Sequence, residues 1–137
     1  METITEDYVS FETAKLLTEK GFDNECSGYY NQERVLQRLS ACSIKDTLKS
    51  PFYFDCIPAP TQQMAMKWLR EIHGIHIQAY CPVFDMDADI LGVKYNIVIS
   101  NLKNRCIAFD TDIDDNEYDS YEEAVESGIK YCLEKLI

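Results

Sequence analysis

Apolar residues recur at helical spacing in three segments of the chain. Each segment begins after a serine or threonine that can cap a helix N-terminus, and the first two end at a glycine. The pattern therefore predicts three helices, over residues 11–20, 62–73 and 121–136. In the second helix we expect one apolar stripe to pack against a sheet at the centre of the core. This stripe consists of Met64, Trp68, Leu69 and Ile72.

Alternating apolar and polar residues predict strands, most clearly in the second half of the chain. Three such segments follow one another and predict an antiparallel meander, over residues 75–81, 93–99 and 105–109. In the first half, a tyrosine pair indicates a short strand at 28–31, and the aromatic segment 52–57 indicates a strand that ends at Pro58. The rest of residues 23–50 mixes helix and strand signals, so no structure is assigned there.

These elements together predict one α+β domain over residues 1–137. Its antiparallel sheet contains the three-stranded meander, and the helices pack on one face of that sheet. A glycine inside a helix costs about 1 kcal/mol relative to alanine. Gly128, within the third predicted helix, therefore indicates a close approach to a neighbouring strand or helix.

The charge balance excludes some functions. The 137 residues include 24 acidic and 13 basic residues, which gives a formal net charge of −11. Such a field repels nucleic-acid backbones and anionic membranes, and the basic residues form no stripe that could offset it. The N-terminus is acidic and no apolar run is long enough to span a membrane, so we expect a cytoplasmic protein.

The six cysteines are widely spaced and include no C-x-x-C pair. This spacing is not typical of a zinc ribbon or a redox motif. Without a secretion signal, we expect all six to be buried, reduced thiols that act as small apolar side chains, with no disulfide. They occupy positions 26, 42, 56, 81, 106 and 132.

Three segments of the chain, residues 11–22, 59–73 and 120–124, resemble a group of small proteins of gut anaerobic bacteria and of their prophages and mobile elements. The function of that group is unknown. The resemblance implies a cytoplasmic accessory protein of phage or mobile-element origin. It implies no activity, cofactor or site residue.

Two acidic segments place oxygen ligands at the first three ligand positions of a calcium loop. They are Asp85, Asp87 and Asp89, and then Asp110, Asp112 and Asp114. Neither segment has the glycine and the final glutamate that an EF-hand needs. The sequence therefore favours solvated loops, with a weak, irregular cation site as the alternative.

His73, His76 and Cys81 are the weak metal-ligand candidates of this chain. The two histidines flank Gly74, and imidazole and thiolate groups suit borderline metals such as zinc. The same residues offer the one pair, Cys81 with His76, in which a base lies close in sequence to a nucleophile. No further motif completes a metal site or a catalytic triad, so we expect no catalytic constellation.

These observations favour a non-catalytic cytoplasmic binding or interaction module with a protein partner of unknown identity and no cofactor. Self-association is left open. One alternative is a small hydrolase-like or metal-dependent enzyme that uses His73, His76 and Cys81. Another is an acidic mimic of nucleic acid that inhibits a DNA-binding partner, although the densest acidic runs fall in predicted loops.

Overall fold

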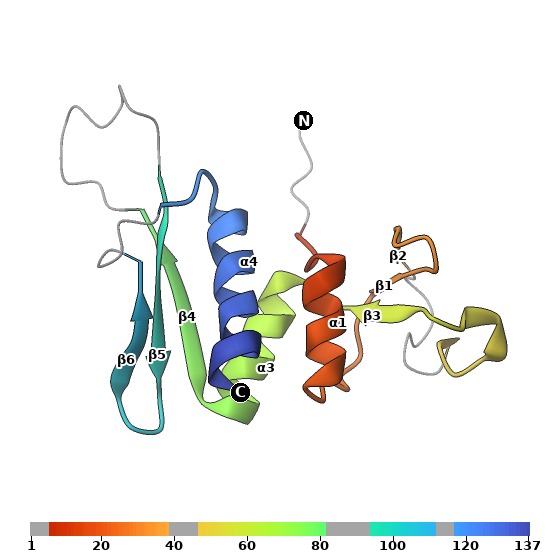
Figure 1. The fold of residues 1–137 in the computed structure, drawn as a ribbon, viewed down its shortest axis with the longest axis horizontal. Coiled ribbons are helices and arrows are strands. Elements are labelled where there is room, and N and C mark those ends of the chain that lie inside the picture. Colours follow the sequence, from red (N-terminus) through yellow and green to blue (C-terminus); the bar gives the residue numbers. More distant parts are fainter. Residues whose placement is uncertain (1–5, 39–46, 82–93, 112–116) are drawn as a thin grey trace.

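The computed structural model describes residues 6–38, 47–81, 94–111 and 117–137. Helices occupy the middle of the molecule, with one antiparallel sheet on each side (Figure 1). The helices are α1 (Phe11–Glu19), α3 (Gln62–His73) and α4 (Tyr121–Tyr131), and the strands are β1 (Gly28–Tyr30), β2 (Leu36–Arg38), β3 (Ile57–Ala59), β4 (Ile75–Tyr80), β5 (Asn96–Asn101) and β6 (Cys106–Asp110). No helix among the described residues is long and apolar enough to cross a membrane.

The three predicted helices are confirmed, together with the residues that begin them. Ser10, Thr61 and Ser120 each accept a hydrogen bond from a backbone N–H in the first turn, at 3.1–3.2 Å. Gly74 ends α3 in the left-handed conformation, with φ at 65°. This arrangement satisfies backbone groups that a helix end otherwise leaves without partners. After Tyr131 the chain continues in a π-helical turn, Cys132–Leu136.

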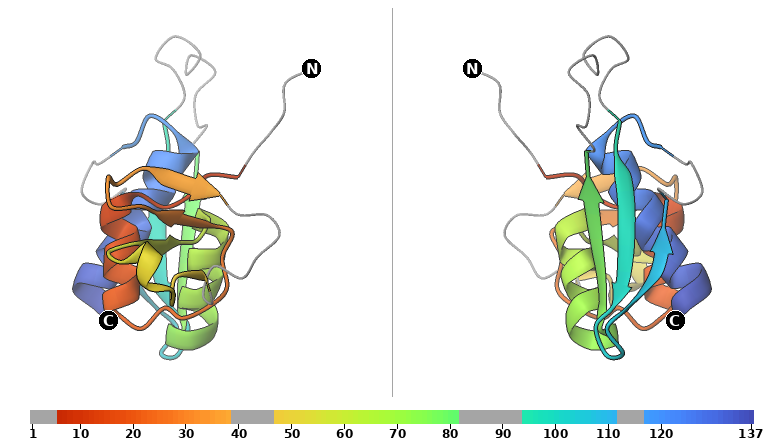
Figure 2. Two further views of the ribbon diagram at one scale, coloured as in Figure 1. Left: turned by 90° about the vertical axis from the view of Figure 1, so that its right-hand side faces the viewer. Right: turned by 90° about the vertical axis from the view of Figure 1, so that its left-hand side faces the viewer.

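The predicted meander is confirmed as the sheet β4-β5-β6. Its inner face carries four buried isoleucines, namely Ile75, Ile77, Ile97 and Ile99. Helices α3 and α4 cover this face, and Figure 2 shows the three strands in front of the helices when the sheet is viewed from its other side. The α+β class, with helices on one face of the meander, is therefore as predicted.

Gly128 lies where α4 crosses this sheet. A Cβ atom at that position would lie 3.0 Å from Ile77 Cγ2 and 3.3 Å from Ile97 Cδ1. These distances leave no ordinary room for a side chain, because apolar carbons in contact prefer about 3.5–4.0 Å. The close approach predicted from the glycine is confirmed.

The buried face of α3 differs in part from the predicted stripe. Trp68 and Leu69 are buried, with 5% and 0% exposed. Met64 and Ile72 are 37% and 61% exposed, so their predicted place in the core was wrong. Met64 lies at the margin of the buried face, which is centred between Ala65 and Leu69, and Ile72 lies in the last turn of the helix.

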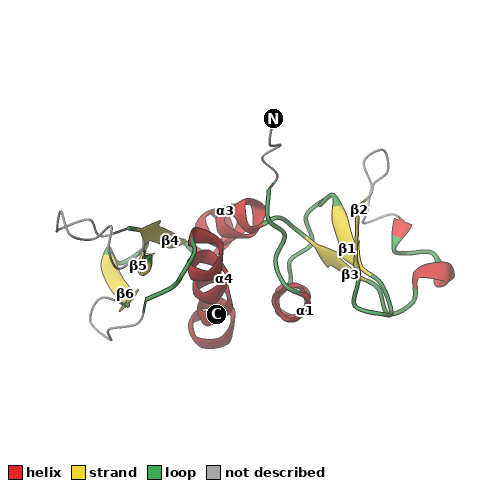
Figure 3. Cartoon of the chain, turned by 90° about the horizontal axis from the view of Figure 1, so that it is seen from above, coloured by secondary structure: helices red, strands yellow, loops and turns green. Residues whose placement is uncertain are grey.

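A second sheet, in the order β2-β1-β3, lies on the other side of α1. Figure 3 shows α1 between this sheet and the pair α3 and α4. Strand β1 is confirmed, but the strand predicted over 52–57 was wrong for most of its length. Pro51–Tyr53 forms a 3-10 turn because proline suits the first position of a helical turn, and pairing with β1 begins only at Ile57.

Candidate functional site

The structure separates the three predicted metal ligands. His73 ends α3, whereas His76 lies in β4 between Ile75 and Ile77, whose side chains face the core. His76 therefore points to the opposite face of the sheet, because successive strand residues alternate. Cys81 follows five residues later, about 16 Å along an extended chain. Among the described residues, no group of three or more His, Cys, Asp or Glu side chains is close enough to hold a metal ion.

The other predicted groups can be placed only in part. The five described cysteines are free thiols, but only Cys132 is buried, and Cys106 is exposed, so its predicted burial was wrong. Burial raises the pKa of Cys132 to about 12. Cys42 lies outside the described residues, as do the acidic segment 85–89 and residues 112–116. Asp110 is the last residue of β6. The calcium alternative therefore stays a prediction.

His73 lines a cavity of about 440 Å³, which we call the base cavity. It lies where α3 ends and β4 begins, at the end of the sheet that Figure 1 draws lowest, next to the last residues of the chain. The antiparallel pairing of β4 with β5 brings the β5–β6 turn to the same place. The cavity is lined by His73, Ile75, Ser100, Asn101, Lys103, Ala108, Leu136 and Ile137.

The imidazole of His73 is held at the edge of the core. Its ring contacts Trp68 edge to face, with ring centroids 4.7 Å apart. Its Nε2 atom is buried and has no hydrogen-bond partner among the described residues. Burial, and then the nearby charge of Lys103, lower the pKa of His73 below 6.5. The ring is therefore neutral at pH 7 and carries one N–H donor and one acceptor nitrogen.

Lys103 is positioned by the same turn that ends α3. Its aliphatic stem lies across Gly74, where an added Cβ would be 3.0 Å from Lys103 Cγ and 3.1 Å from Cε. The backbone N–H of Leu102 donates to the carbonyl of Gly74 at 2.7 Å, which joins the β5–β6 turn to the α3–β4 turn. The Asn101 side chain accepts a hydrogen bond from the N–H of Lys103 at 3.0 Å. These hydrogen bonds thus fix the backbone of Lys103 beside the α3–β4 turn, where His73 lies.

The lowered pKa of His73 gives a stability difference that depends on pH. Its contribution is fully present above about 6.5, the unfolded pKa, and is lost as pH falls through the lower folded pKa, because the folded protein resists protonation. We expect the wild type to lose more stability between about pH 7.5 and about pH 5 than His73→Phe, which keeps a ring beside Trp68 but cannot titrate. Urea unfolding at both pH values measures this. Equal losses in the two proteins would contradict the expectation.

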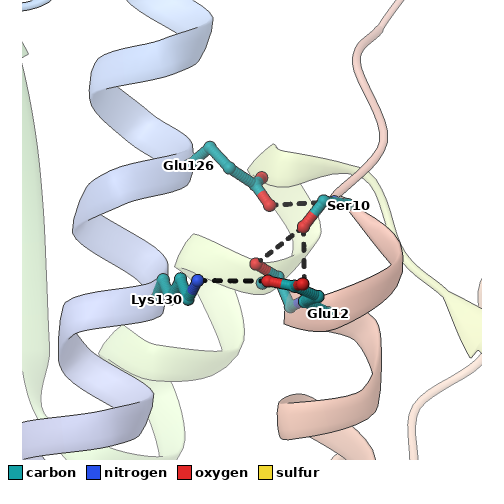
Figure 4. A network of polar contacts seen from close by, with 5 residues as sticks. Ser10, Glu12, Glu126 and Lys130 are labelled. Atoms are coloured by element: carbon teal, nitrogen blue, oxygen red, sulfur yellow. Dashed lines mark hydrogen bonds and ion pairs between the residues drawn. The ribbon is translucent and has the colours of Figure 1, made fainter.

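A second hollow, of about 520 Å³, lies where the first turns of α1 and α3 meet α4, and we call it the helix groove. Glu126 of α4 lines this hollow, and its carboxylate points toward Ser10 (Figure 4). One carboxylate oxygen accepts from the backbone N–H of Ser10 at 2.8 Å, and the other accepts from Gln62 Nε2 at 3.3 Å. Lys130 and Glu12 form an ion pair at 3.2 Å beside them. These mutually satisfied groups join the three helices, so we interpret the groove as structural.

Glu126→Ala is expected to lower the free energy of unfolding by about 1–2 kcal/mol, because the backbone N–H of Ser10, the residue that caps α1, loses its charged acceptor. Equilibrium urea unfolding provides the measurement. Glu122→Ala is the matched control, since that residue lies one turn earlier on α4 and its backbone carbonyl, rather than its side chain, binds Gln62. Similar losses in the two variants would show that Glu126 does not join α1 to α4 as described.

A third feature is an exposed aromatic tip, formed by Phe52, Tyr53 and Phe54. It lies at the end of the molecule farthest from the β4-β5-β6 sheet (Figure 1). Phe52 and Phe54 are 80% and 66% exposed, whereas Tyr53 packs edge to face against Tyr29 at a centroid distance of 5.7 Å. The sequence analysis missed this exposure because it assigned the segment to a strand.

Comparison of the chain with protein-family models, with curated proteins and with solved structures finds no match. The resemblance to proteins of gut bacteria and their prophages therefore stays a prediction, as does the cytoplasmic location. Function can therefore be inferred only from the residues that form the base cavity, the helix groove and the aromatic tip.

Proposed function

We propose that the protein is a non-catalytic binding module whose ligand occupies the base cavity. The carrying observation is the base cavity itself, which has a volume of about 440 Å³ and combines apolar side chains with those of His73, Ser100, Asn101 and Lys103. A hollow with apolar walls and a few polar groups is typical of a small-molecule site. A water molecule needs about 30 Å³, so the cavity has room for a ligand of several heavy atoms.

The lining residues support binding more than catalysis. Ser100 is the only residue among them with a hydroxyl side chain, and His73 Nε2 makes no hydrogen bond to it. No carboxylate side chain lines the cavity to orient the imidazole, as a triad requires. The lowered pKa of His73 also makes the ring a weaker base.

The proposal can be tested with three probes that share one apolar chain, namely hexanoate, hexylamine and hexanol, each at about 5 mM, where weak ligands bind. We expect at least one probe to shift the backbone amide NMR signals of Ser100, Asn101 and Lys103. Ala108→Trp fills the cavity and is expected to abolish these shifts. Ile107→Trp is the matched control, because Ile107 is an exposed neighbour on β6 that does not line the cavity.

Two results would overturn the proposed function. In the first, none of the three probes shifts these amide signals in the wild type. In the second, the shifts persist unchanged in Ala108→Trp, which would place the probe elsewhere.

Protein binding through the aromatic tip is a second candidate function. Large exposed aromatic side chains on a braced support are typical anchors of protein interfaces. The net charge of −11 favours a basic partner through long-range attraction. In a matched capture from lysate, the double variant Phe52→Ser, Phe54→Ser should lose a basic protein that the wild type retains at low salt. Equal retention by both proteins would exclude the aromatic tip as the binding surface.

The acidic-mimic alternative stays a prediction, because many of the acidic residues lie outside the described residues.

A further inference from the structure

We propose that the outer edge of β2 binds an extended acidic peptide, whose carboxylates are held by the guanidinium groups of Arg34 and Arg38. β2 is an edge strand, because the second sheet has the order β2-β1-β3 and none of the described strands pairs with β2 on its outer side. A peptide strand can form backbone hydrogen bonds at such an edge. This surface is separate from the base cavity, so the inference does not depend on the proposed function.

Both arginines are held against aromatic rings in or just before the first turn of α1. The Cζ atom of Arg34 lies 4.8 Å from the ring centre of Phe11, and that of Arg38 lies 5.2 Å from the ring centre of Tyr8. The Tyr8 ring in turn lies against Gly28, where an added Cβ would be 2.8 Å from Tyr8 Cε1. A guanidinium group that is stacked on a ring has less conformational freedom to lose when it binds a ligand.

The two guanidinium groups are also accessible to a ligand. Both arginines are exposed, and neither guanidinium group forms a hydrogen bond or an ion pair with another described residue. The chain has 24 acidic residues and only 13 basic ones, and Lys94 and Lys130 each have a carboxylate partner. A pair of arginines without such partners therefore forms a local positive site, which a ligand with two carboxylates complements.

The backbone of Arg34 supports a role for its side chain. Arg34 is the third residue of the loop between Asn31 and Val35, and its φ of 64° lies in the left-handed region. Glycine suits this position of a three-residue hairpin loop, because it adopts the conformation without steric cost. An arginine there retains local backbone strain, which proteins concentrate at functional positions.

A peptide fits this edge better than a nucleic acid does. The N–H of Asn31 donates to the carbonyl of Val35 at 3.1 Å. In the alternating antiparallel pattern, the N–H and C=O groups of Leu36 therefore point away from β1. A peptide backbone can pair with these groups, whereas a nucleic acid offers no matching ladder. A short peptide also meets less of the repulsion that the net charge of −11 exerts on a long polyanion.

The order of residues along this edge predicts the spacing of the acidic residues in the peptide. Side chains on one face of a strand recur at every second residue, which is the spacing of Arg34, Leu36 and Arg38. Strand addition therefore places two acidic side chains opposite the arginines, four residues apart, with an apolar side chain between them opposite Leu36. The preferred ligand is an extended segment of the pattern acidic-x-apolar-x-acidic.

NMR titrations of the full chain with four capped heptapeptides test this preference. The reference peptide is Thr-Glu-Thr-Val-Thr-Glu-Thr. Two control peptides carry glutamine or lysine in place of both glutamates, and the third carries its second glutamate one position earlier, on the opposite face of the strand. Read from the amide signals of Leu36 and Arg38, the reference peptide should bind at least roughly tenfold more tightly than each control. Equal binding of any control peptide would overturn the inference.

Charge reversal separates recognition from a structural role of the arginines. In the double variant Arg34→Glu, Arg38→Glu, the lysine peptide should bind at least roughly tenfold more tightly than the reference peptide at the same amides. A structural role alone predicts no such reversal. The control Lys67→Glu, Lys135→Glu changes the net charge equally at two exposed positions elsewhere, and it should keep the preference of the wild type. A reversed preference in this control would overturn the inference, because overall charge would then explain the effect.

Arg38→Lys provides a test that does not depend on the folding of the charge-reversed variant. Lysine keeps the positive charge but lacks the planar fork that binds a carboxylate through two hydrogen bonds. The reference peptide should therefore bind at least roughly threefold more weakly to Arg38→Lys than to the wild type. Undiminished binding would overturn the inference. Tighter binding of hexathymidylate than of the reference peptide at the same amides would also overturn it and would identify a nucleic-acid surface instead.

Discussion

Trp68→Ala is expected to lower the free energy of unfolding by about 3–5 kcal/mol. The indole is almost fully buried and packs edge to face against Phe22, with centroids 5.5 Å apart, as well as against His73. Truncation to alanine therefore removes apolar burial and leaves a cavity whose walls relax only in part. Equilibrium unfolding in urea, monitored by circular dichroism because the variant lacks the only tryptophan of the chain, measures the loss.

Ile72→Ala, one turn further along the same helix, is the matched control. Its side chain is exposed, so we expect a change within about 0.5 kcal/mol. If Trp68→Ala cost no more than Ile72→Ala, the described packing between α3 and Phe22 would be incorrect. Trp68→Ala should also loosen the His73 ring, which packs against the indole, so weaker binding of any probe that occupies the base cavity should accompany its loss of stability.

Much of the fold follows from local signals in the sequence. A hydroxyl side chain caps each helix, Gly74 ends α3 in a conformation that suits glycine, and alternation reveals the three strands of the meander. Alternation also places His76 on the face of the sheet opposite Ile75. These features depend on residues only a few positions apart, which is why a single sequence is enough to predict them.

The base cavity could not be predicted in this way. His73 and Lys103 are far apart in sequence, and they meet because Ile75 pairs with Asn101 across β4 and β5. Strand register of this kind depends on tertiary packing, and a shift by one residue would reverse every side chain. Lys103 therefore gave no signal of its own, and the sequence analysis instead grouped His73 with His76 and Cys81.

Apart from β1, which the tyrosine pair indicated, the second sheet was not predicted, for a different reason. Its strands β1, β2 and β3 have three residues each, which is too short for a period of two to be distinguished. Pro58 lies inside β3, opposite Tyr29, although a proline usually marks the end of a strand or its edge. Proline is tolerated here because β3 is an edge strand in the order β2-β1-β3.

Gly128→Val is expected to lower the free energy of unfolding by about 2–3 kcal/mol. Even the first carbon of the new side chain would approach Ile77 Cγ2 to 3.0 Å, and the two methyl groups of valine extend further toward the sheet. The gain in helix propensity over glycine is smaller than about 1 kcal/mol and does not offset this overpacking. Gly128→Ala should cost less than Gly128→Val, because a single methyl group requires only a small shift of Ile77. Urea unfolding of both variants measures the difference.

A double-mutant cycle with Ile77→Ala tests the proposed cause. Ile77→Ala alone should cost about 2–5 kcal/mol as a cavity-forming change, but it also removes the atom nearest to Gly128. The valine of Gly128→Val can then occupy part of the vacated space, so the double variant should lose at least about 1 kcal/mol less than the sum of the single losses. Ile75→Ala is the control for the second change, since Ile75 faces the core from the same strand without being among the nearest neighbours of Gly128. Equal coupling of Gly128→Val to both isoleucine variants would show that the cost arises from the helix itself rather than from its contact with Ile77.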